Sequence, residues 1–375
     1  MRFPEFSGEW EEHKLCHIAS IVGRIGFRGY TTNDIVAKGE GAIALSPTNI
    51  ENNKLTYDKD NTYISFYKYE ESPEIMIKKG DVIFVKTGST VGKVAYVDKL
   101  ICKTTLNPQV VVLKNIQCNS YLLSVLLSTN RFQNAIRKIT VGGAVPTLSQ
   151  GAMGNIAVIM PKVSEQEKLS KFISLLDERI ATQSKVIEKL QSLIKGIRNV
   201  IFGKLRKNAG FNAMIGDVLN YEQPQSYIVE NTEYIDKGTP VLTANKAFVL
   251  GYTSEVDGIY DKGNCIIFDD FTLDCKYVDF PFKIKSSAIK ILTAKSNTLL
   301  RYVYEFLKYL DLSTEEHKRH YITEIQRQGL ILPEPKTVEM VAYTFTALSS
   351  RLTSTIQLRN NYETQKQYLL RHMFI

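Results

Sequence analysis

Residues Ser164–Phe202 read SEQEKLSKFISLLDERIATQSKVIEKLQSLIKGIRNVIF, and this stretch decides the fold. Ser164 followed by Glu167 is the sequence pattern of a capping box, in which side chains and backbone would satisfy each other's free groups at the start of a helix. Behind it, apolar residues recur with the spacing of a heptad seam. The seam positions are Ile173, Leu176, Ile180, Ile187, Leu190, Ile194 and Ile197. We therefore expect a central long helix over residues 163–207, which needs a partner for its narrow apolar face.

A segment near the C-terminus offers that partner. Residues 335–375 open with Pro-Lys, as the central segment does at Pro161, and a shift of 172 residues aligns the two segments. The shift places Phe345, Leu348, Leu352 and Leu369 on the seam. It also places Arg359 and Lys366 there, so the second seam is weaker in its middle. We expect a second long helix over residues 335–375 that pairs with the first.

The regions before the two helices resemble each other. GEGAIALSPTNI (39–50) matches DKGTPVLTANKAF (236–248), and KKGDVIFVKTGSTVGKVAYV (78–97) matches DKGNCIIFDDFTLDCKYVDF (261–280). Each pair predicts strands that enclose a polar turn. A helical pattern follows in both regions, from Asn119 and from Thr298. The expected fold class is α+β with an internal repeat: similar mixed domains at 1–162 and 208–334, each followed by a long helix.

Composition limits the class of protein. A chain of 375 residues suits two domains of ordinary size. The net charge of +8 permits binding to nucleic acid. Five cysteines without a CxxC pair fit neither a disulfide framework nor a zinc ribbon, so we expect no metal. No apolar run is long enough to span a membrane and no secretory signal is present, so we expect a soluble, cytoplasmic protein.

The sequence lacks the motifs of a Walker-type nucleotide-binding enzyme and of an adenine methyltransferase. In KTGSTVGKVAYV (86–97) the two glycines are too close for a Walker loop, and a valine follows Lys93 where a serine or threonine is needed. The loop instead predicts a hairpin tip. An adenine methyltransferase would carry the tetrapeptide Asn/Asp-Pro-Pro-Tyr/Phe, whereas the most similar tetrapeptide in this sequence is Asn107-Pro108-Gln109-Val110. We expect no catalytic residues on this chain.

Five stretches, in this order, resemble a known family. They are FPEFSGEWEEHKL (3–15), KTGSTVGKV (86–94), GGAVPTLSQGAMGNIAVIMPKVSEQEKL (142–169), KYVDFPF (276–282) and HKRHYITE (317–324). Together with the repeated plan, they resemble the DNA-specificity subunits of type I restriction-modification systems. The likeness covers essentially the whole chain.

This resemblance implies a function and partners. It implies two target-recognition domains separated by two long antiparallel helices, which read a split, asymmetric sequence in double-stranded DNA. The expected protein partners are two adenine-methyltransferase subunits and the translocase/endonuclease subunits. S-adenosylmethionine, ATP and magnesium would bind those partners, so no cofactor is expected on this chain.

Candidate DNA-binding side chains occur in polar turns and basic clusters, where they can donate to phosphates or read base edges. In the first domain they are Lys86, Ser89, Thr90 and Lys93 at the hairpin tip, Ser46, Thr48 and Asn49 in a turn, and Arg131, Arg137 and Lys138 on or after the helical segment. In the second domain they are Thr243, Asn245, Lys246, Lys276, Tyr277, Lys318, Arg319, His320 and Tyr321. Ordinary solvated turns and a basic helix end would explain the same residues without DNA.

Two other classes of function stay open. The chain is alternatively the recognition-domain portion of a methyltransferase-endonuclease enzyme, although the missing catalytic motifs argue against it. It is alternatively a coiled-coil scaffold without a DNA role, which would leave the repeated globular domains unexplained.

Overall fold

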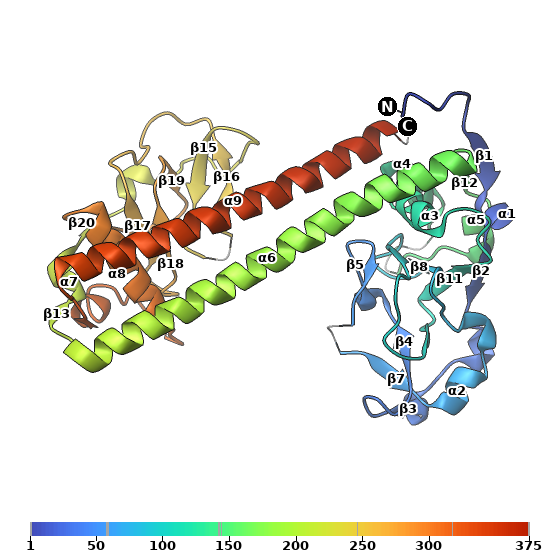
Figure 1. The fold of residues 1–375 in the computed structure, drawn as a ribbon, viewed down its shortest axis with the longest axis horizontal. Coiled ribbons are helices and arrows are strands. Elements are labelled where there is room, and N and C mark those ends of the chain that lie inside the picture. Colours follow the sequence, from blue (N-terminus) through green and yellow to red (C-terminus); the bar gives the residue numbers. More distant parts are fainter. Residues whose placement is uncertain are drawn as a thin grey trace. The chain divides into compact units, whose positions relative to one another are not determined.

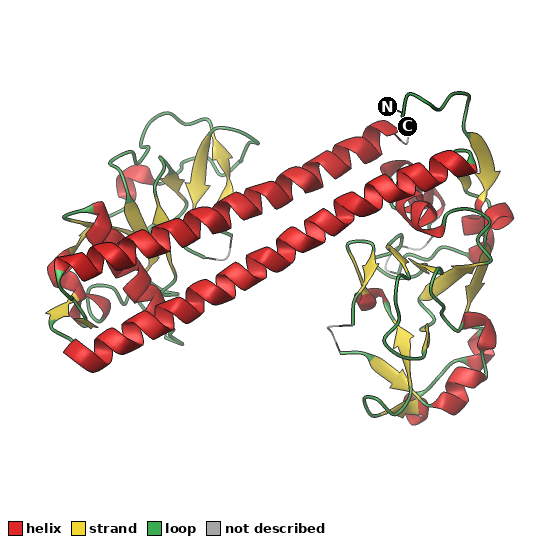
Figure 2. Ribbon diagram, viewed as in Figure 1, coloured by secondary structure: helices red, strands yellow, loops and turns green. Residues whose placement is uncertain are grey.

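The computed structural model describes residues 2–57, 60–141, 143, 145–245, 247–316 and 318–373. The chain divides into two compact units. The first unit contains Met1–Ala181 and Asn360–Ile375, and the second contains Thr182–Arg359. Both combine strands with helices (Figure 2). Each contains part of the long helices α6 (Val163–Ala209) and α9 (Pro335–Met373).

The first unit contains most of the short elements. Its strands are β1 (Glu11–Lys14), β2 (Ser20–Gly23), β3 (Ile35–Val36), β4 (Ala42–Leu45), β5 (Ile50–Glu51), β6 (Lys54–Leu55), β7 (Thr62–Ile64), β8 (Val82–Val85), β9 (Val94–Tyr96), β10 (Thr104–Leu106), β11 (Val110–Lys114) and β12 (Ala157–Met160). Its shorter helices are α1 (Leu15–Ile18), α2 (Phe66–Glu70), α3 (Ser120–Leu127), α4 (Asn130–Ile139) and α5 (Gln150–Gly154).

The second unit is built from fewer elements. Its strands are β13 (Ala213–Met214), β14 (Leu219–Glu222), β15 (Thr239–Leu242), β16 (Val249–Thr253), β17 (Cys265–Asp269), β18 (Cys275–Val278), β19 (Lys283–Ile284), β20 (Ile289–Ala294) and β21 (Gly329–Leu330). Its shorter helices are α7 (Ile215–Val218) and α8 (Asn297–Leu310).

Sheet topology confirms the internal repeat. The order β2-β11-β8-β9 in the first unit is repeated as β14-β20-β17-β18 in the second, with antiparallel neighbours throughout. Strand β4 pairs in parallel with β10, as β15 does with β19. A short antiparallel pair closes each unit, β1 with β12 and β13 with β21. The sequence therefore encodes one α+β fold twice.

Both faces of the main sheet are buried in each unit. In β8, Val82 and Phe84 pack with α3 and α4, whereas Ile83 and Val85 pack towards β4 and β10. Strand β17 repeats this arrangement, because Phe268 faces α8 and Ile267 faces β15 and β19. Since alternate side chains of a strand point to opposite faces, such strands are apolar without interruption. This burial on both faces explains why every residue of VIFV in β8 and of CIIF in β17 is apolar.

The helical pattern after Asn119 forms two helices rather than one. α3 ends at Leu127 and α4 begins at Asn130. The hydroxyls of Ser128 and Thr129 donate to the carbonyls of Val125 and Leu126, at 2.7 and 2.6 Å. Short polar side chains of this kind compete with the backbone for helical hydrogen bonds. The corresponding region of the second unit is the single helix α8.

The α6–α9 pairing follows the predicted seam. Ile173, Leu176, Ile187, Ile194 and Phe345 are buried, whereas Ile180, Leu190, Ile197, Leu348, Leu352 and Leu369 are partly buried. In each unit the helices lie side by side and run in opposite directions (Figure 1). In the first unit the Asp177 carboxylate pairs with Lys366, and in the second unit the Arg198 guanidinium of α6 lies over the Phe345 ring of α9.

A polar contact attaches the first unit's sheet and helix layer to this helix pair. The carboxylate of Asp177 on α6 accepts from the hydroxyl of Tyr121 on α3, at 2.8 Å, and from the ammonium group of Lys366 on α9, at 2.6 Å. Lys366, which weakened the predicted seam, is therefore an ion-pair partner. One carboxylate connects three helices.

The second unit uses a different polar cluster in the same role. Glu305 on α8 is buried and accepts from Arg198 on α6, at 2.6 and 2.9 Å, and from Arg301, at 2.7 Å. Arg301 also donates to the Phe345 carbonyl and the Ser349 hydroxyl on α9, at 3.0 and 2.5 Å. Because a buried charge is costly unless paired, these bonds restrict how α8 docks on the long helices.

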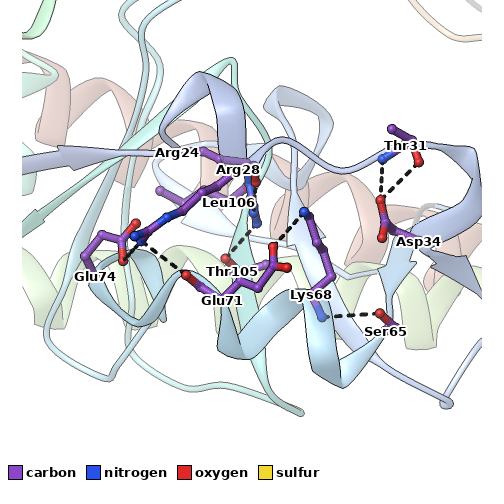
Figure 3. A network of polar contacts seen from close by, with 10 residues as sticks. All are labelled: Arg24, Arg28, Thr31, Asp34, Ser65, Lys68, Glu71, Glu74, Thr105 and Leu106. Carbon is purple, nitrogen blue, oxygen red and sulfur yellow. Dashed lines mark hydrogen bonds and ion pairs between the residues drawn. The ribbon is translucent and has the colours of Figure 1, made fainter.

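A further polar network in the first unit connects the segment after β2 with β10 and α2 (Figure 3). Arg24 is buried and donates to the Leu106 carbonyl, at 2.9 Å, and to the Thr105 hydroxyl, at 3.1 Å. Arg28 reaches the Glu71 carbonyl, at 3.2 Å, beside α2. Burial lowers the pKa of the Arg24 guanidinium. These bonds attach the segment after β2 to β10 and α2.

Helices of the described residues are too polar or too short to cross a lipid bilayer.

Replacing Phe345 with alanine tests the seam. The ring is fully buried, 0% exposed, in the core that α6, α8 and α9 share. We expect Phe345→Ala to lose about 3–5 kcal/mol of unfolding free energy, measured by guanidinium unfolding. Tyr343 on the same helix is 78% exposed, so Tyr343→Ala is the matched control. Equal effects of the two substitutions would contradict this packing.

Candidate nucleic-acid interface

The hairpin predicted at KTGSTVGKV is present. Strands β8 and β9 pair antiparallel, and residues 86–93 form the connection. Gly88 and Gly92 both have left-handed backbones, with φ of +103° and +96°. A Cβ on Gly92 would meet Oε1 of Gln133 at 2.4 Å. The Gln133 amide donates to the Gly92 carbonyl, at 2.8 Å, so α4 lies directly against the hairpin tip.

A second loop docks on this tip in the first unit. The amide of Gly88 donates to the Pro146 carbonyl, at 2.9 Å, and the amide of Leu148 donates to the Lys86 carbonyl, at 2.8 Å. Leu148 is buried, whereas Val141 and Val145 are exposed. We call residues 86–93, the described residues of 141–148, and the exposed side of α4 the first tip surface.

The second unit repeats this arrangement with different chemistry. His320 donates its backbone amide to the Asp270 carbonyl, at 3.1 Å, and Asp270 directly follows β17 as Lys86 directly follows β8. The Asp270 carboxylate also accepts from the amides of His320 and Tyr321, at 3.0 and 2.7 Å. We call residues 270–274 and 318–321 the second tip surface.

Most predicted residues of the first unit lie at or near its tip surface. Ser89 and Lys93 are exposed, and Lys86 and Thr90 are partly buried. Arg131, Arg137 and Lys138 are exposed on α4. The Lys93 ammonium group lies 3.4 Å from the Ile50 carbonyl, which brings the turn of Ser46 and Thr48 near the tip. Ser46 is partly buried and Thr48 is exposed, with 2.7 Å between their hydroxyl oxygens.

Asn49 does not fit the predicted base-reading role. Its side chain is only 2% exposed. The carbonyl oxygen accepts from the Ser46 amide, at 2.9 Å, and the amide nitrogen donates to Asn61 and to the Thr56 carbonyl, at 2.7 and 3.1 Å. Both ends of the amide are engaged inside the protein, so Asn49 holds its turn together.

In the second unit the predicted turn also meets its tip. Asn245 is exposed and accepts from the Thr272 hydroxyl, at 3.1 Å, while Thr243 is partly buried. Lys246 lies outside the described residues. Lys276 is partly buried on β18. Tyr277 packs under Arg301 and beside Tyr304 of α8, at 5.1 and 5.7 Å, which places its ring against the helix layer instead of the tip.

The basic cluster predicted at 318–321 separates into two pairs. Lys318 and Arg319 are exposed, and the Lys318 ammonium group pairs with Glu316 and Glu324, at 2.5 and 2.9 Å. His320 and Tyr321 are 2% and 0% exposed. Tyr321 packs on Phe268 and Tyr221, with ring centres 5.4 and 5.7 Å apart. Both side chains are buried and anchor the loop, which does not favour the predicted contact of His320 and Tyr321 with DNA.

Sequence reasoning missed the residues that hold the loops in place, Gln133 and Asp270. Asp270 had a signal, since carboxylates at a hairpin tip are unexpected in a protein of net charge +8. Gln133 had none, because a glutamine on a helix is ordinary.

The described residues contain no group of three or more His, Cys, Asp or Glu that could hold a metal ion.

The comparisons with known proteins agree on one family. A family model described as the type I restriction modification DNA specificity domain matches residues 8–192. The EcoR124I/EcoR124II specificity subunit of Escherichia coli is 41% identical over 171 residues, which is 41% of this chain and 41% of that protein. The MjaVIII specificity subunit of Methanocaldococcus jannaschii is 26% identical over 150 residues, 40% of this chain and 34% of that protein. The matched stretches span well under half of both relatives.

Solved structures show the same fold over nearly the whole chain. The S subunit of a type I restriction-modification system from M. genitalium aligns with a TM-score of 0.69 and 13% identity, covering 100% of this chain and 99% of that one. A chain from a study of complex assembly and conformational transition in a type I system aligns with a TM-score of 0.51 and 13% identity, covering 99% of this chain and 98% of that one.

The buried His320 predicts a pH-dependent loop. Its Nδ1 lies 2.9 Å from a Glu324 carboxylate oxygen and its Nε2 lies 3.3 Å from the Glu316 carbonyl. Both partners only accept, so the ring satisfies both as an imidazolium. The hydrogen bond to Glu324 raises the pKa of His320, and the same bond, with that from Lys318, lowers the pKa of Glu324.

A raised folded-state pKa means that the stabilisation is complete below the unfolded pKa of histidine, about 6.5, and is lost as pH rises through the folded value. An NMR titration should place the His320 midpoint above 6.5. The pH dependence of stability in that window should shrink in His320→Gln. A midpoint at or below 6.5 would contradict the ion pair.

Proposed function

We propose that this chain is the sequence-reading subunit of a type I restriction-modification complex, which is supported by the match of residues 8–192 to the DNA specificity domain model and by the 41% identity to a specificity subunit over 171 residues. In this role each unit binds one segment of double-stranded DNA. The two segments together form a split, asymmetric target.

The observation that carries this proposal is the repeated docking of a loop on a hairpin tip. Both units use the same sheet topology and present the same pair of loops. Their exposed side chains differ, with Ser89 and Lys93 on the first tip surface and Lys318 and Arg319 on the second. One fold with two unlike surfaces supports two unlike half-sites.

The exposed groups suit DNA chemically. Lysines pair with phosphate oxygens, whereas the guanidinium group of Arg319 can bond the O6 and N7 atoms of guanine at once. Ser89 offers a hydroxyl for base edges or phosphates. The left-handed backbone at Gly88 and Gly92 keeps the hairpin tip tight, and the absence of a Cβ at Gly92 makes room for Gln133 of α4.

The long helices would set the distance between the half-sites. Successive major-groove faces of DNA are about 34 Å apart, and a helix rises about 1.5 Å per residue. A continuous helix the length of α6 is therefore long enough to bridge that distance. Contacts between the two helices within each unit, Asp177–Lys366 in the first and Arg198–Phe345 in the second, support this spacer role.

The chemistry would come from other subunits. The chain would bind two adenine-methyltransferase subunits, and translocase/endonuclease subunits would join them. S-adenosylmethionine, ATP and magnesium would bind those partners. A non-catalytic role on this chain is supported by Asn107-Pro108-Gln109-Val110, which lacks the second proline and the aromatic ring of an adenine methyltransferase motif. Since the DNA target is chromosomal or invading DNA, the complex would act in the cytoplasm.

Mapping methylated adenines tests this function. Co-expression with the cognate methyltransferase subunit should give adenine methylation at one motif made of two unlike parts with a fixed gap. Single-molecule sequencing of the host DNA reads the motif. A substitution at Tyr67, which is 77% exposed on α2, should leave the motif unchanged. A continuous palindrome, or no motif despite a stable complex, would refute the proposal.

Lengthening both helices tests the spacer role. Seven residues are inserted after Ile187 in α6 and seven after Thr355 in α9, because both residues are buried and a full heptad preserves the seam. The insertion adds about 10 Å, or about three base pairs at 3.4 Å each. The gap in the methylated motif should lengthen while both half-sites keep their bases. Changed half-site bases with an unchanged gap would contradict the spacer.

A further inference from the structure

We propose that the buried ion pair of Asp270 and Lys290 is the positioning device that sets the specificity of the second unit, by holding the loop of Lys318 and Arg319 on its hairpin tip. This inference rests on the proposed DNA-reading function. It assigns the second half-site to the 318–319 loop and assigns its geometry to two residues that do not touch DNA.

The pair lies inside the protein. Asp270 and Lys290 are each 1% exposed, and the Lys290 ammonium group lies 3.5 Å from Oδ2 of Asp270. Lys290 also donates to the side-chain carbonyl of Gln223, at 2.8 Å. Removing one partner of such a pair leaves an uncompensated buried charge. The two residues therefore depend on each other.

The other carboxylate oxygen of Asp270 is directed at the loop. Oδ1 accepts the backbone amides of His320 and Tyr321, at 3.0 and 2.7 Å. These amides directly follow Lys318 and Arg319, so their position determines where the two cations emerge. Charge-assisted bonds of this kind are stronger than neutral ones. The electrostatic state of Asp270 thus sets the position of the loop.

The first unit shows that this chemistry is not required by the fold. Its loop docks through backbone groups, Gly88 to Pro146 and Leu148 to Lys86. Lys86 stands where the second unit has Asp270, as the first residue after the strand. Opposite Phe84, the neighbouring strand presents the apolar Val111, whereas opposite Phe268 it presents Lys290. The ion pair is therefore a feature of the second unit.

Burial of the Asp269 and Asp270 carboxylates also reduces the repulsion between this hairpin tip and DNA phosphates. A hairpin tip with Asp269 and Asp270 would repel phosphate if both carboxylates faced outward. Both are buried, and Asp269 accepts the amides of Phe271 and Thr272, at 2.9 Å each. The carboxylates are used internally, while Lys318 and Arg319 are exposed. The tip supports the loop, and the loop reads the DNA.

Three variants separate positioning from general stability. Asp270→Asn keeps an oxygen for the two amides but leaves Lys290 without its carboxylate. Lys290→Met removes the cation at similar volume and leaves the Asp270 carboxylate buried without its cation. The double variant removes both charges and keeps the amide acceptor. Glu255→Gln is the matched control, because Glu255 pairs with the buried Lys283, at 2.6 Å, elsewhere in the same unit.

Hydrogen exchange of the intact chain gives the first readout. We expect Asp270→Asn to speed exchange at the amides of His320 and Tyr321, and the double variant to restore their protection. The amide ladder between β14 and β20 should stay protected in all variants, which shows that the unit remains folded. Unchanged exchange in Asp270→Asn, or no recovery in the double variant, would overturn the positioning role.

Competition binding of the assembled methyltransferase complex gives the second readout, with DNA libraries randomised in one half-site at a time. Asp270→Asn should lower affinity roughly 5- to 100-fold through the second half-site alone, the range expected for one lost base contact, and the double variant should recover most of it. Equal loss at both half-sites, or loss in Glu255→Gln as well, would overturn the inference.

The two readouts fail differently. If the unaltered complex binds no specific sequence, the proposed function fails, and the assignment of a half-site to this loop fails with it. The exchange experiment uses no DNA, so it still decides whether the ion pair positions the loop.

Discussion

Burial of one apolar seam between α6 and α9 is the constraint on which the rest of the structure depends. The seam continues into the cores: Ile173 and Leu369 join the core of the first unit, and Ile194, Phe345 and Leu348 join that of the second. Neither helix can change register without exposing those residues, because a heptad seam has a single apolar face. The polar contacts at Asp177 and at Glu305 add directional bonds to this non-directional packing.

The repeat supplies two copies of one scaffold, and the tips are where the copies diverge. Both units bury the two faces of an antiparallel sheet and close with a loop on a hairpin. In the first unit the loop is held by backbone bonds, and in the second a buried carboxylate adds to the backbone bond between His320 and Asp270. Such a division lets exposed side chains vary without loss of the core, which is the pattern expected where function lies on loops carried by a rigid scaffold.

Much of the fold could be predicted from the sequence, because it depends on periodicity. The heptads and the matched strand segments indicate the helices and the repeat, and the two close glycines indicate a hairpin tip. The break between α3 and α4 at Ser128 and Thr129 could not be predicted, because serine and threonine also occur inside helices. The burial of Asn49, His320 and Tyr321 could not be predicted from the sequence either. Polar and aromatic residues in a turn look the same in sequence whether they face solvent or hold the turn from within.

The residues predicted to bind DNA differ in exposure even within one motif. Lys318 and Arg319 lie on the surface, whereas the next two residues of the same motif anchor the loop. The Asp270 carboxylate, which is distant in sequence, accepts the backbone amides of His320 and Tyr321. Long-range hydrogen bonds of this kind become visible only in three dimensions.

Site-specific crosslinking tests the central claim most directly, that each unit reads its own half of a split target through its tip surface. A photoreactive amino acid is placed at Ser89 or at Arg319 in the assembled complex, and at Tyr67, an exposed residue of α2 that belongs to neither tip surface, as the control. The account predicts that the first two positions crosslink to opposite halves of the methylated motif and that Tyr67 does not crosslink. Crosslinks of both positions to the same half, or from Tyr67 as efficiently as from the tips, would contradict it.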